Sequence, residues 1–290
     1  MNIHVICNPS AGNGTGKTAL LKTEAYLKQH EVTAVFHETF QPQHATELTR
    51  KAVDAGADTV IAIGGDGTLH EVAQSITGTN TALGIVPAGT GNDFVKTVHI
   101  PIEPEKALEL ILNGTPKPVD TVRINEMLFL NECGCGFDVM VLDYAEKAKK
   151  IAKGILPYMH GVIQTIFHFK DIDVSLSADD GPLQKLSILV LAVANGRFIG
   201  GGIPISPRAV PDDGLLDILV VRGMNKLRMM SVLPGLLKGK IESFPESTHY
   251  FARKLHVEGA SLRINIDGEI VSLNQADIEI LPSSLLVYRP

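Results

Sequence analysis

The chain has 290 residues, of which 44% are hydrophobic and 20% charged, so it has enough apolar side chains for sizeable cores and too many for disorder. This length lies near the upper limit for one hydrophobic core, which favours two domains. Twenty-six basic and 32 acidic side chains give a net charge of −6, with no Trp and 5% aromatic residues, which excludes a general nucleic-acid binder.

Cysteine usage and the apolar runs indicate the compartment. Cys7, Cys133 and Cys135 are an odd number, and the Cys-X-Cys pair supplies only half of a tetrahedral zinc site. The first residues lack the apolar segment of a secretory signal, and the longest apolar stretch, residues 186–194, is about half a membrane span. We therefore expect a cytoplasmic protein without a disulfide framework or a zinc knuckle.

The first 118 residues alternate short apolar runs with segments of helical spacing. This alternation predicts a doubly wound α/β domain with a parallel sheet. Its glycines and acids collect in loops after the strands, where the carboxyl ends of parallel strands bind ligands. The predicted strands are residues 3–7, 32–36, 59–63 and 82–86, and the predicted helices are residues 15–29, 45–55, 68–75 and 103–112.

Two loops have the composition of phosphate-binding turns. Gly64-Gly65-Asp66-Gly67-Thr68 follows a buried strand and precedes a helix, so its backbone can approach a phosphate at a helix N-terminus, with Asp66 near Mg²⁺ or a ribose. Residues 87–94 supply two glycines, a hydroxyl and a carboxylate. The alternative is a pair of ordinary turns, with Thr68 capping one helix and Asn92 or Asp93 capping the next.

The loop after the first strand resembles a P-loop at its end, Gly16-Lys17-Thr18, but Ala11 replaces the first glycine of that motif. A P-loop NTPase also places a Walker B carboxylate at a strand end, whereas Asp66 comes after two glycines. Phosphate contact by residues 8–12 is the favoured interpretation, and a true P-loop is the alternative.

After residue 118 the pattern changes to alternating runs such as residues 262–266, which predict antiparallel strands. We expect an α/β domain of residues 1–122 and a β-rich domain of residues 123–290. Two acidic turns stand out in the second half, residues 211–217 and 264–269. Either can be an ordinary turn between strands, since Asp-Gly is common in hairpins. The alternative is a metal or catalytic site.

Taken together, these motifs resemble the diacylglycerol kinase catalytic-domain family, especially bacterial soluble lipid kinases, which sphingosine kinases also resemble. NAD kinases and phosphofructokinases carry a similar Gly-Gly-Asp-Gly loop, so this loop alone does not identify the family. The resemblance rests on all the motifs together. The matching segments cover nearly the whole chain in the family's order and are residues 8–12, 64–68, 89–94, 131–138, 195–202, 213–217 and 267–269.

The resemblance implies an NAD kinase/diacylglycerol kinase-like α/β domain and a β-rich antiparallel second domain, with the active site in the interdomain cleft. Residues 278–290 would return to the first domain. ATP would transfer its γ-phosphate to a lipid hydroxyl, most readily that of diacylglycerol, with Mg²⁺ as cofactor.

The resemblance also assigns site residues. Glu269 would accept the proton, and Asp267 and Asp93 are the next catalytic candidates. Val210, Asp213 and Leu215 would hold a structural Mg²⁺, partly through backbone carbonyls. His70 stands where many relatives have Asn. Nucleotide contacts would come from Asn8, Pro9, Ser10, Ala11, Gly12, Thr39, Gly64, Gly65, Asp66, Gly67, Thr68, Leu69, His70 and Thr90.

The segment of residues 146–170 is both basic and apolar, and includes Lys147, Lys149, Lys150 and Lys153. Such a segment favours contact with an anionic bilayer, which would make the enzyme peripheral to the inner face of the membrane. An amphipathic helix packed on the second domain, with its lysines in water, is the alternative.

Two other functions stay open, a soluble-metabolite kinase of the NAD kinase type and a nucleotide-binding regulator without turnover. The sequence does not determine which lipid is the acceptor, whether the chain is a homodimer, or whether His70 alters nucleotide preference.

Overall fold

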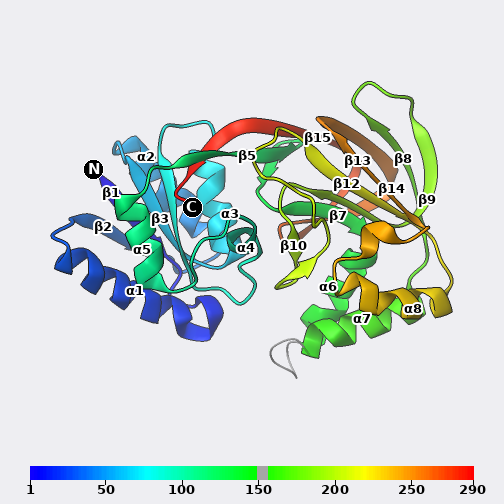
Figure 1. Ribbon diagram of the computed structural model, residues 1–290, viewed down its shortest axis with the longest axis horizontal. Helices are drawn as coiled ribbons and strands as arrows, with labels where there is room; N and C mark the ends of the chain where they lie inside the picture. Colours follow the sequence, from blue (N-terminus) through cyan, green and yellow to red (C-terminus); the bar gives the residue numbers. More distant parts are fainter. Residues whose placement is uncertain (149–155) are drawn as a thin grey trace. The chain divides into compact units, whose positions relative to one another are not determined.

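Figure 1 shows a computed structural model of the protein, which describes residues 1–148 and 156–290. The chain divides into two compact units, and it passes from one to the other four times. Unit 1 comprises Met1–Thr121, Pro211–Gly214 and Leu281–Pro290, and unit 2 comprises Val122–Val210 and Leu215–Ile280.

Unit 1 alternates strands with helices. Its strands are β1 (Ile3–Cys7), β2 (Ala34–Glu38), β3 (Thr59–Gly64) and β4 (Ala82–Pro87). Its helices are α1 (Ala11–Gln29), α2 (His44–Asp54), α3 (Asp66–Ile76), α4 (Asp93–Thr97) and α5 (Pro104–Asn113).

The strands of unit 1 form a parallel sheet in the order β4-β3-β1-β2, and the last residues of the chain pair in parallel with β4. Every residue of β1, β3 and β4 is buried, which explains their continuous apolar sequences. Helices therefore cover both faces, with α1 against α5 and α2 against α3. β2 begins two residues later than the sequence predicts and ends two residues later.

Unit 2 consists mostly of strands. They are β5 (Lys117–Ile124), which crosses the boundary, β6 (Met127–Phe129), β7 (Glu132–Gly136), β8 (Ile172–Ala178), β9 (Gln184–Ala194), β10 (Phe198–Ile199), β11 (Ile203–Pro204), β12 (Leu216–Arg222), β13 (Ser247–Ala252), β14 (Lys254–Ile266) and β15 (Glu269–Val287), whose end lies in unit 1. Its helices are α6 (Phe137–Ala148), α7 (Leu156–His168), α8 (Lys226–Leu236) and the short 3₁₀ helix η1 (Ile241–Ser243).

Two long strands, β9 and β14, organise unit 2. Each pairs antiparallel with β7 over one part of its length and with β8 over another. β12 and β13 extend the sheet beyond β9, and β15 extends it beyond β14. One apolar core lies among these strands, and a second joins them to α6, α7, α8 and η1, which lie together in Figure 1.

The predicted fold class, an α/β part with a parallel sheet and a β-rich part with antiparallel strands, is confirmed. Among the described residues, no helix has the length and apolar character needed to cross a membrane.

Candidate functional site

The loop after β1 is folded back against the neighbouring loops of unit 1. The Asn8 N–H donates to the Ile63 carbonyl, and the Asn8 side-chain amide lies 3.3 Å from Thr68 Oγ1. Gly12 has a positive φ of 56°, and a Cβ placed on it would lie 2.2 Å from the Ala88 carbonyl oxygen. The loop therefore meets the ends of both β3 and β4, and it needs glycine to do so.

The glycine loop after β3 packs directly on the loop after β4. A Cβ on Gly65 would lie 2.9 Å from Gly89 Cα, and a Cβ on Gly89 would lie 2.3 Å from Gly65 Cα. By contrast, a Cβ on Gly67 would meet nothing within 4 Å, so the backbone is open there. Gly65 is the N-cap of α3, and Thr68 lies inside that helix. The first-turn N–H groups of α3 can therefore face an anion.

Asp66 joins the two glycine loops. Its Oδ1 accepts a 2.8 Å hydrogen bond from the Asp93 N–H, and its Oδ2 lies beside Gly91. Asn92 closes the second loop, because its side-chain amide both accepts from and donates to the Gly89 backbone. The predicted residues of the two loops are thus brought together at one edge of the sheet.

The remaining predicted nucleotide contacts are placed around the same loops. Thr39 is buried, and its N–H donates to the Cys7 carbonyl at the end of β1. His70 is buried in α3, with Nε2 2.5 Å from the Gln74 amide nitrogen. Thr90 is exposed in the second loop. His70 therefore packs within the helix, whereas Thr90 can reach a ligand.

The Asp-Gly-Glu motif forms the hairpin between β14 and β15 in unit 2. Ile266 pairs with Glu269, and Asp267 and Gly268 have φ values of 47° and 99°, as a two-residue hairpin turn requires. The Asp267 carboxylate accepts hydrogen bonds of 2.8 to 3.1 Å from the backbone N–H groups of residues 130, 131 and 132. Glu269 is exposed at the start of β15. Asp267 thus fixes the turn that presents Glu269.

Two asparagines outside the predicted site set complete this turn region. Asn131 donates through its side chain to the Phe198 carbonyl, and its own carbonyl accepts from the N–H groups of Asn195 and Gly196. The Asn195 side chain donates to the Leu130 carbonyl. Both asparagines lie in segments that resemble the family, 131–138 and 195–202, and this could have identified them from the sequence. A buried Asn side chain usually forms hydrogen bonds with backbone groups.

Glu132 and the carboxylate of the partly exposed Asp138 are buried close to this turn. A Cβ on Gly134 would lie 2.5 Å from Glu132 Oε1 and 3.2 Å from Asp138 Oδ2. Burial raises the pKa of Asp138 to about 6, although contacts with the Val139 N–H and Asn265 oppose the shift. Among the described residues, neither carboxylate oxygen of Asp138 has a hydrogen-bond partner with normal geometry. Asp138 therefore holds a proton more readily than an exposed acid.

The segment predicted to hold structural Mg²⁺ is anchored by a buried acid that the sequence analysis missed. Asp120 accepts 2.7 Å hydrogen bonds from the N–H groups of Gly214 and Ser283, and its own N–H donates to the Pro211 carbonyl. Val210 and Asp213 are exposed and Leu215 is partly buried. Asp120 is separated from these partners by about a hundred residues or more in sequence, so no local pattern indicated it.

A narrow apolar cavity lies in unit 2, where α8 and η1 cover β9 and β12. It is partly open to solvent, has a cavity volume of about 50 Å³, and only apolar side chains expose surface in it. Such a lining suits the end of a hydrocarbon chain rather than a polar group. The lining residues are Phe137, Ile166, Leu189, Val190, Val221, Met224, Met229, Val232, Leu233, Leu236, Ile241 and Phe244.

Two family models match successive parts of the chain. Residues 2–124 match the family described as diacylglycerol kinase catalytic domain, and residues 131–289 match the YegS C-terminal NAD kinase beta sandwich-like domain. A protein of Mycobacterium tuberculosis named diacylglycerol kinase is 30% identical, over 99% of this chain and 95% of its own length. The chain belongs to the diacylglycerol kinase family. The predicted resemblance is confirmed, and the chain is a phosphotransferase of the lipid kinase type.

Other relatives agree over most of the chain. A probable lipid kinase YegS-like of Pseudomonas aeruginosa is 35% identical, over 87% of this chain and 83% of its own length. The crystal structure of a putative diacylglycerol kinase from Bacillus anthracis has a TM-score of 0.81 at 28% identity, covering 100% of this chain and 97% of that one. An NAD kinase from Archaeoglobus fulgidus, solved in complex with ATP, has a TM-score of 0.53 at 15% identity, covering 100% and 94% of the two chains, and shares the fold.

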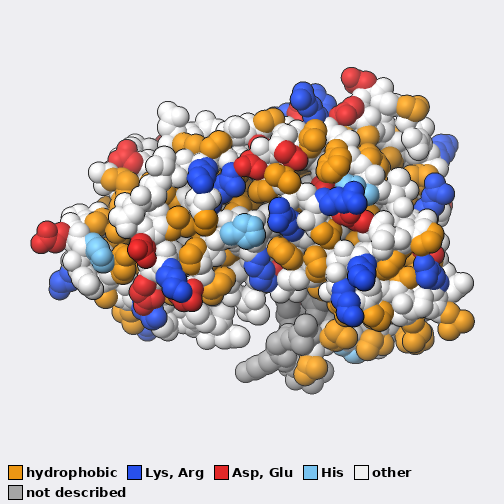
Figure 2. All heavy atoms as spheres, viewed as in Figure 1, with side chains coloured by type: hydrophobic (Ala, Val, Ile, Leu, Met, Phe, Trp, Pro, Cys, Tyr) orange, Lys and Arg blue, Asp and Glu red, His pale blue; other side chains and the backbone are white. Residues whose placement is uncertain are grey.

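The surface of this diacylglycerol kinase family member is apolar over α7 and α8 (Figure 2). The exposed apolar side chains there include Ile163 and Phe167 of α7, and Leu227 and Met230 of α8, which are 81% and 53% exposed. Lys and Arg side chains lie beside them in Figure 2. Of the lysines in the predicted membrane segment, Lys147 lies at the end of α6, while Lys149, Lys150 and Lys153 lie outside the described residues.

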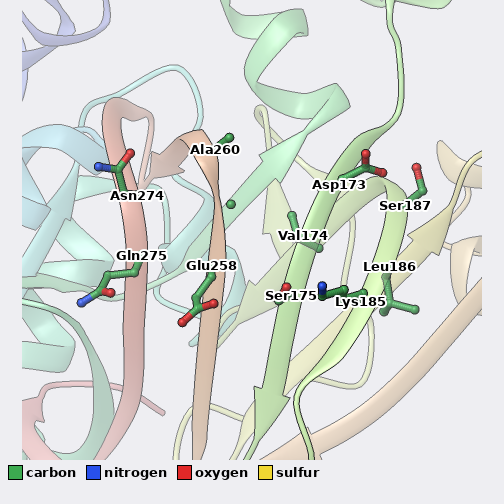
Figure 3. Close-up of a pocket in the computed structure, with 11 residues that line it drawn as sticks. Asp173, Val174, Ser175, Lys185, Leu186, Ser187, Glu258, Ala260, Asn274 and Gln275 are labelled. Carbon is green, nitrogen blue, oxygen red and sulfur yellow. The ribbon is translucent and has the colours of Figure 1, made fainter.

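A shallow polar hollow on unit 2, shown in Figure 3, is separate from the predicted site residues. Its side chains come from four strands, with Asp173 on β8, Lys185 on β9, Glu258 on β14 and Gln275 on β15. None of the predicted nucleotide, catalytic or metal residues lines it. Its mixture of charges and its open shape suit solvent better than a lipid chain.

The raised pKa of Asp138 predicts a pH dependence of stability. The unfolded chain loses this proton near pH 4 and the folded chain near pH 6, so Asp138 lowers the free energy of unfolding as pH rises through this range. Relative to wild type, Asp138→Asn should gain stability between pH 4 and pH 7, by an amount on the order of 3 kcal/mol. Urea denaturation of both proteins at pH 4 and at pH 7 measures this difference in the free energy of unfolding.

Asp143 on the same helix is the matched control. A hydrogen bond from Arg263 lowers the pKa of Asp143, so this acid stabilises the fold in full above its ordinary pKa and loses that contribution as pH falls. Asp143→Asn should therefore lose stability relative to wild type as pH rises. If Asp138→Asn shows no pH-dependent gain, Asp138 is not held in a desolvated site.

Proposed function

We propose that the chain transfers the γ-phosphate of ATP to the hydroxyl of a membrane lipid, most readily diacylglycerol, to give phosphatidic acid. The observation that carries this proposal is the convergence of three glycine-containing loops after β1, β3 and β4, with Asp66 joining the second loop to the third. Backbone N–H groups at a helix N-terminus and a nearby acid are the parts that phosphoryl transfer requires. The apolar cavity of unit 2 supports a lipid as acceptor.

The first step is nucleotide binding in unit 1. The backbone around Gly67 is open, so phosphate oxygens can approach the first turn of α3. Residues 8–12 border the same place through Gly12 and Asn8. We assign the phosphates to these loops, with Thr39, His70 and Thr90 at their edges.

The oxygen atoms near the glycine loops suit Mg²⁺. Oδ2 of Asp66 and Oδ2 of Asp93 would lie 2.7 and 3.5 Å from a Cβ on Gly91, so both carboxylates border one place. Hard oxygen ligands of this kind are those that Mg²⁺ prefers. When bound, Mg²⁺ would neutralise phosphate charge. The second proposed ion would be held by Asp213 and the carbonyls of Val210 and Leu215.

The transfer step needs a proton acceptor for the lipid hydroxyl. We assign it to Glu269, because this acid is exposed on a turn that the Asp267 carboxylate holds through three backbone N–H groups. As the hydroxyl oxygen bonds to the γ-phosphorus, its proton passes to Glu269 and the bond from that phosphorus to the ADP oxygen breaks. Asp267 has a positioning part in this scheme.

The proposed reaction is tested by following labelled γ-phosphate from ATP onto diacylglycerol, onto a total lipid extract and onto NAD. Wild type should label diacylglycerol and leave NAD unlabelled. Glu269→Gln keeps the shape and removes the base, so turnover should fall by about 10² to 10⁴ while ATP affinity stays within about threefold. Near-normal turnover of Glu269→Gln would reject the assigned base, and labelling of NAD alone would reject the lipid acceptor.

The apolar cavity is the proposed site of the acyl chain, so filling it should select against long chains. Leu233 lines the cavity, and Leu233→Trp should lower kcat/KM for long-chain diacylglycerol by about tenfold or more. The variant should phosphorylate a short-chain acceptor as efficiently as wild type does. Leu237→Trp is the control, because Leu237 is the exposed C-cap residue of α8 and does not line the cavity. Equal loss on both acceptors would place the acyl chain elsewhere.

The exposed apolar side chains of α7 and α8 are the proposed membrane contact. Leu227→Glu should weaken binding to vesicles of phosphatidylglycerol and phosphatidylcholine by about tenfold or more, since it removes an apolar side chain and adds a negative charge. Leu183→Glu makes the same change at a 51% exposed leucine between β8 and β9, and should bind as wild type does. Cosedimentation measures both, and equal binding of the two variants would contradict the proposed contact.

A further inference from the structure

Unit 2 contains a cluster of three metal-ligand side chains that are not among the predicted nucleotide, catalytic or metal residues. Asp217 of β12, Glu242 of η1 and His249 of β13 each offer one ligand atom, and these atoms lie within 4.8 Å of one another. The register explains two of them, since His249 is opposite Leu219 and Asp217 lies two residues from Leu219 on the same face. η1 brings the third side chain over that face.

Each carboxylate of the cluster uses one oxygen and leaves the other without a partner. His249 Nε2 lies 2.6 Å from Asp217 Oδ1, and Arg208 Nε lies 2.9 Å from Glu242 Oε2. Asp217 Oδ2 and Glu242 Oε1 are buried with no hydrogen-bond partner in the described parts of the chain. Asp217 is only 2% exposed, so its second oxygen cannot rely on bulk water. Such an oxygen is costly to bury unless it binds something.

We propose that Asp217, Glu242 and His249 form a binding site for a divalent transition metal ion, with Zn²⁺ as the ion that fits best. Zn²⁺ accepts imidazole nitrogen together with carboxylate oxygen, whereas Mg²⁺ and Ca²⁺ favour oxygen alone. On binding, the ring nitrogen that faces Asp217 coordinates the ion as neutral imidazole, and any proton it carried passes to solvent. Water completes the coordination.

The site has a structural consequence for the apolar cavity. Glu242 lies in η1, and the flanking residues Ile241 and Phe244 line the cavity wall. An ion held by Glu242, Asp217 and His249 ties η1 to β12 and β13. Metal occupancy therefore stabilises this wall of the cavity.

The test is titration of the full chain with Zn²⁺ against a chromophoric chelator, after chelator treatment and in a millimolar excess of Mg²⁺. The Mg²⁺ fills oxygen-only sites and leaves the nitrogen-containing site to Zn²⁺. Wild type should bind one Zn²⁺ per chain. His249→Gln and Glu242→Gln should each weaken that binding by about 100-fold or more, since even outer contacts of metal ligands change affinity by about 10 to 100-fold.

His256→Gln is the matched control. His256 also contacts two acids, but Asp277 lies on its Nδ1 and Glu258 on its Nε2, so these carboxylates do not converge on one ion. This variant should bind Zn²⁺ as wild type does. Hydrogen exchange of wild type should slow at residues 241–244 when Zn²⁺ is added, which tests the site without any substitution. Absence of Zn²⁺ binding by wild type, or unchanged binding by His249→Gln and Glu242→Gln, would overturn the proposal.

Discussion

The proposed nucleotide site in unit 1 depends on how closely the backbones of three loops approach one another. Gly65 and Gly89 are in direct backbone contact, and Gly12 touches the Ala88 carbonyl, so a Cβ at any of these three positions would overlap a neighbouring backbone atom. These contacts bring the carboxyl ends of β1, β3 and β4 together and leave the start of α3 open. Glycine is thus needed for packing between the loops, and in the proposed reaction it also gives a phosphate access to the backbone.

In unit 2, side-chain hydrogen bonds rather than glycine contacts hold the loops together. The Asp267 carboxylate gathers three consecutive backbone N–H groups from residues 130–132, and Asn131 and Asn195 hold the neighbouring loop. This network orients a two-residue turn rather than a helix start. It explains why Asp267 and Glu269, two residues apart, have different surroundings, one engaged by backbone and the other exposed.

The sequence predicted the parts of this architecture that depend on local pattern. Continuous apolar runs located β1, β3 and β4 to within one residue, because strands buried on both faces leave no other signature. Glycine spacing located the loops. Thr68 as a helix cap was a wrong alternative, since the extended Gly65 begins α3. Contacts between distant segments, such as Asp120 with Gly214 and Ser283, have no local signature and required the fold.

The acids of this chain differ by environment rather than by type. Asp66 and Asp267 accept backbone N–H groups and hold loops in place, Asp138 is desolvated and keeps its proton to about pH 6, and Asp217 is buried against an imidazole. Lone pairs that already accept backbone hydrogen bonds are poorly placed to take a proton from a substrate. In the proposed reaction, proton transfer therefore belongs to an exposed acid at a fixed position, and Glu269 meets both conditions because its neighbour Asp267 supplies the rigidity.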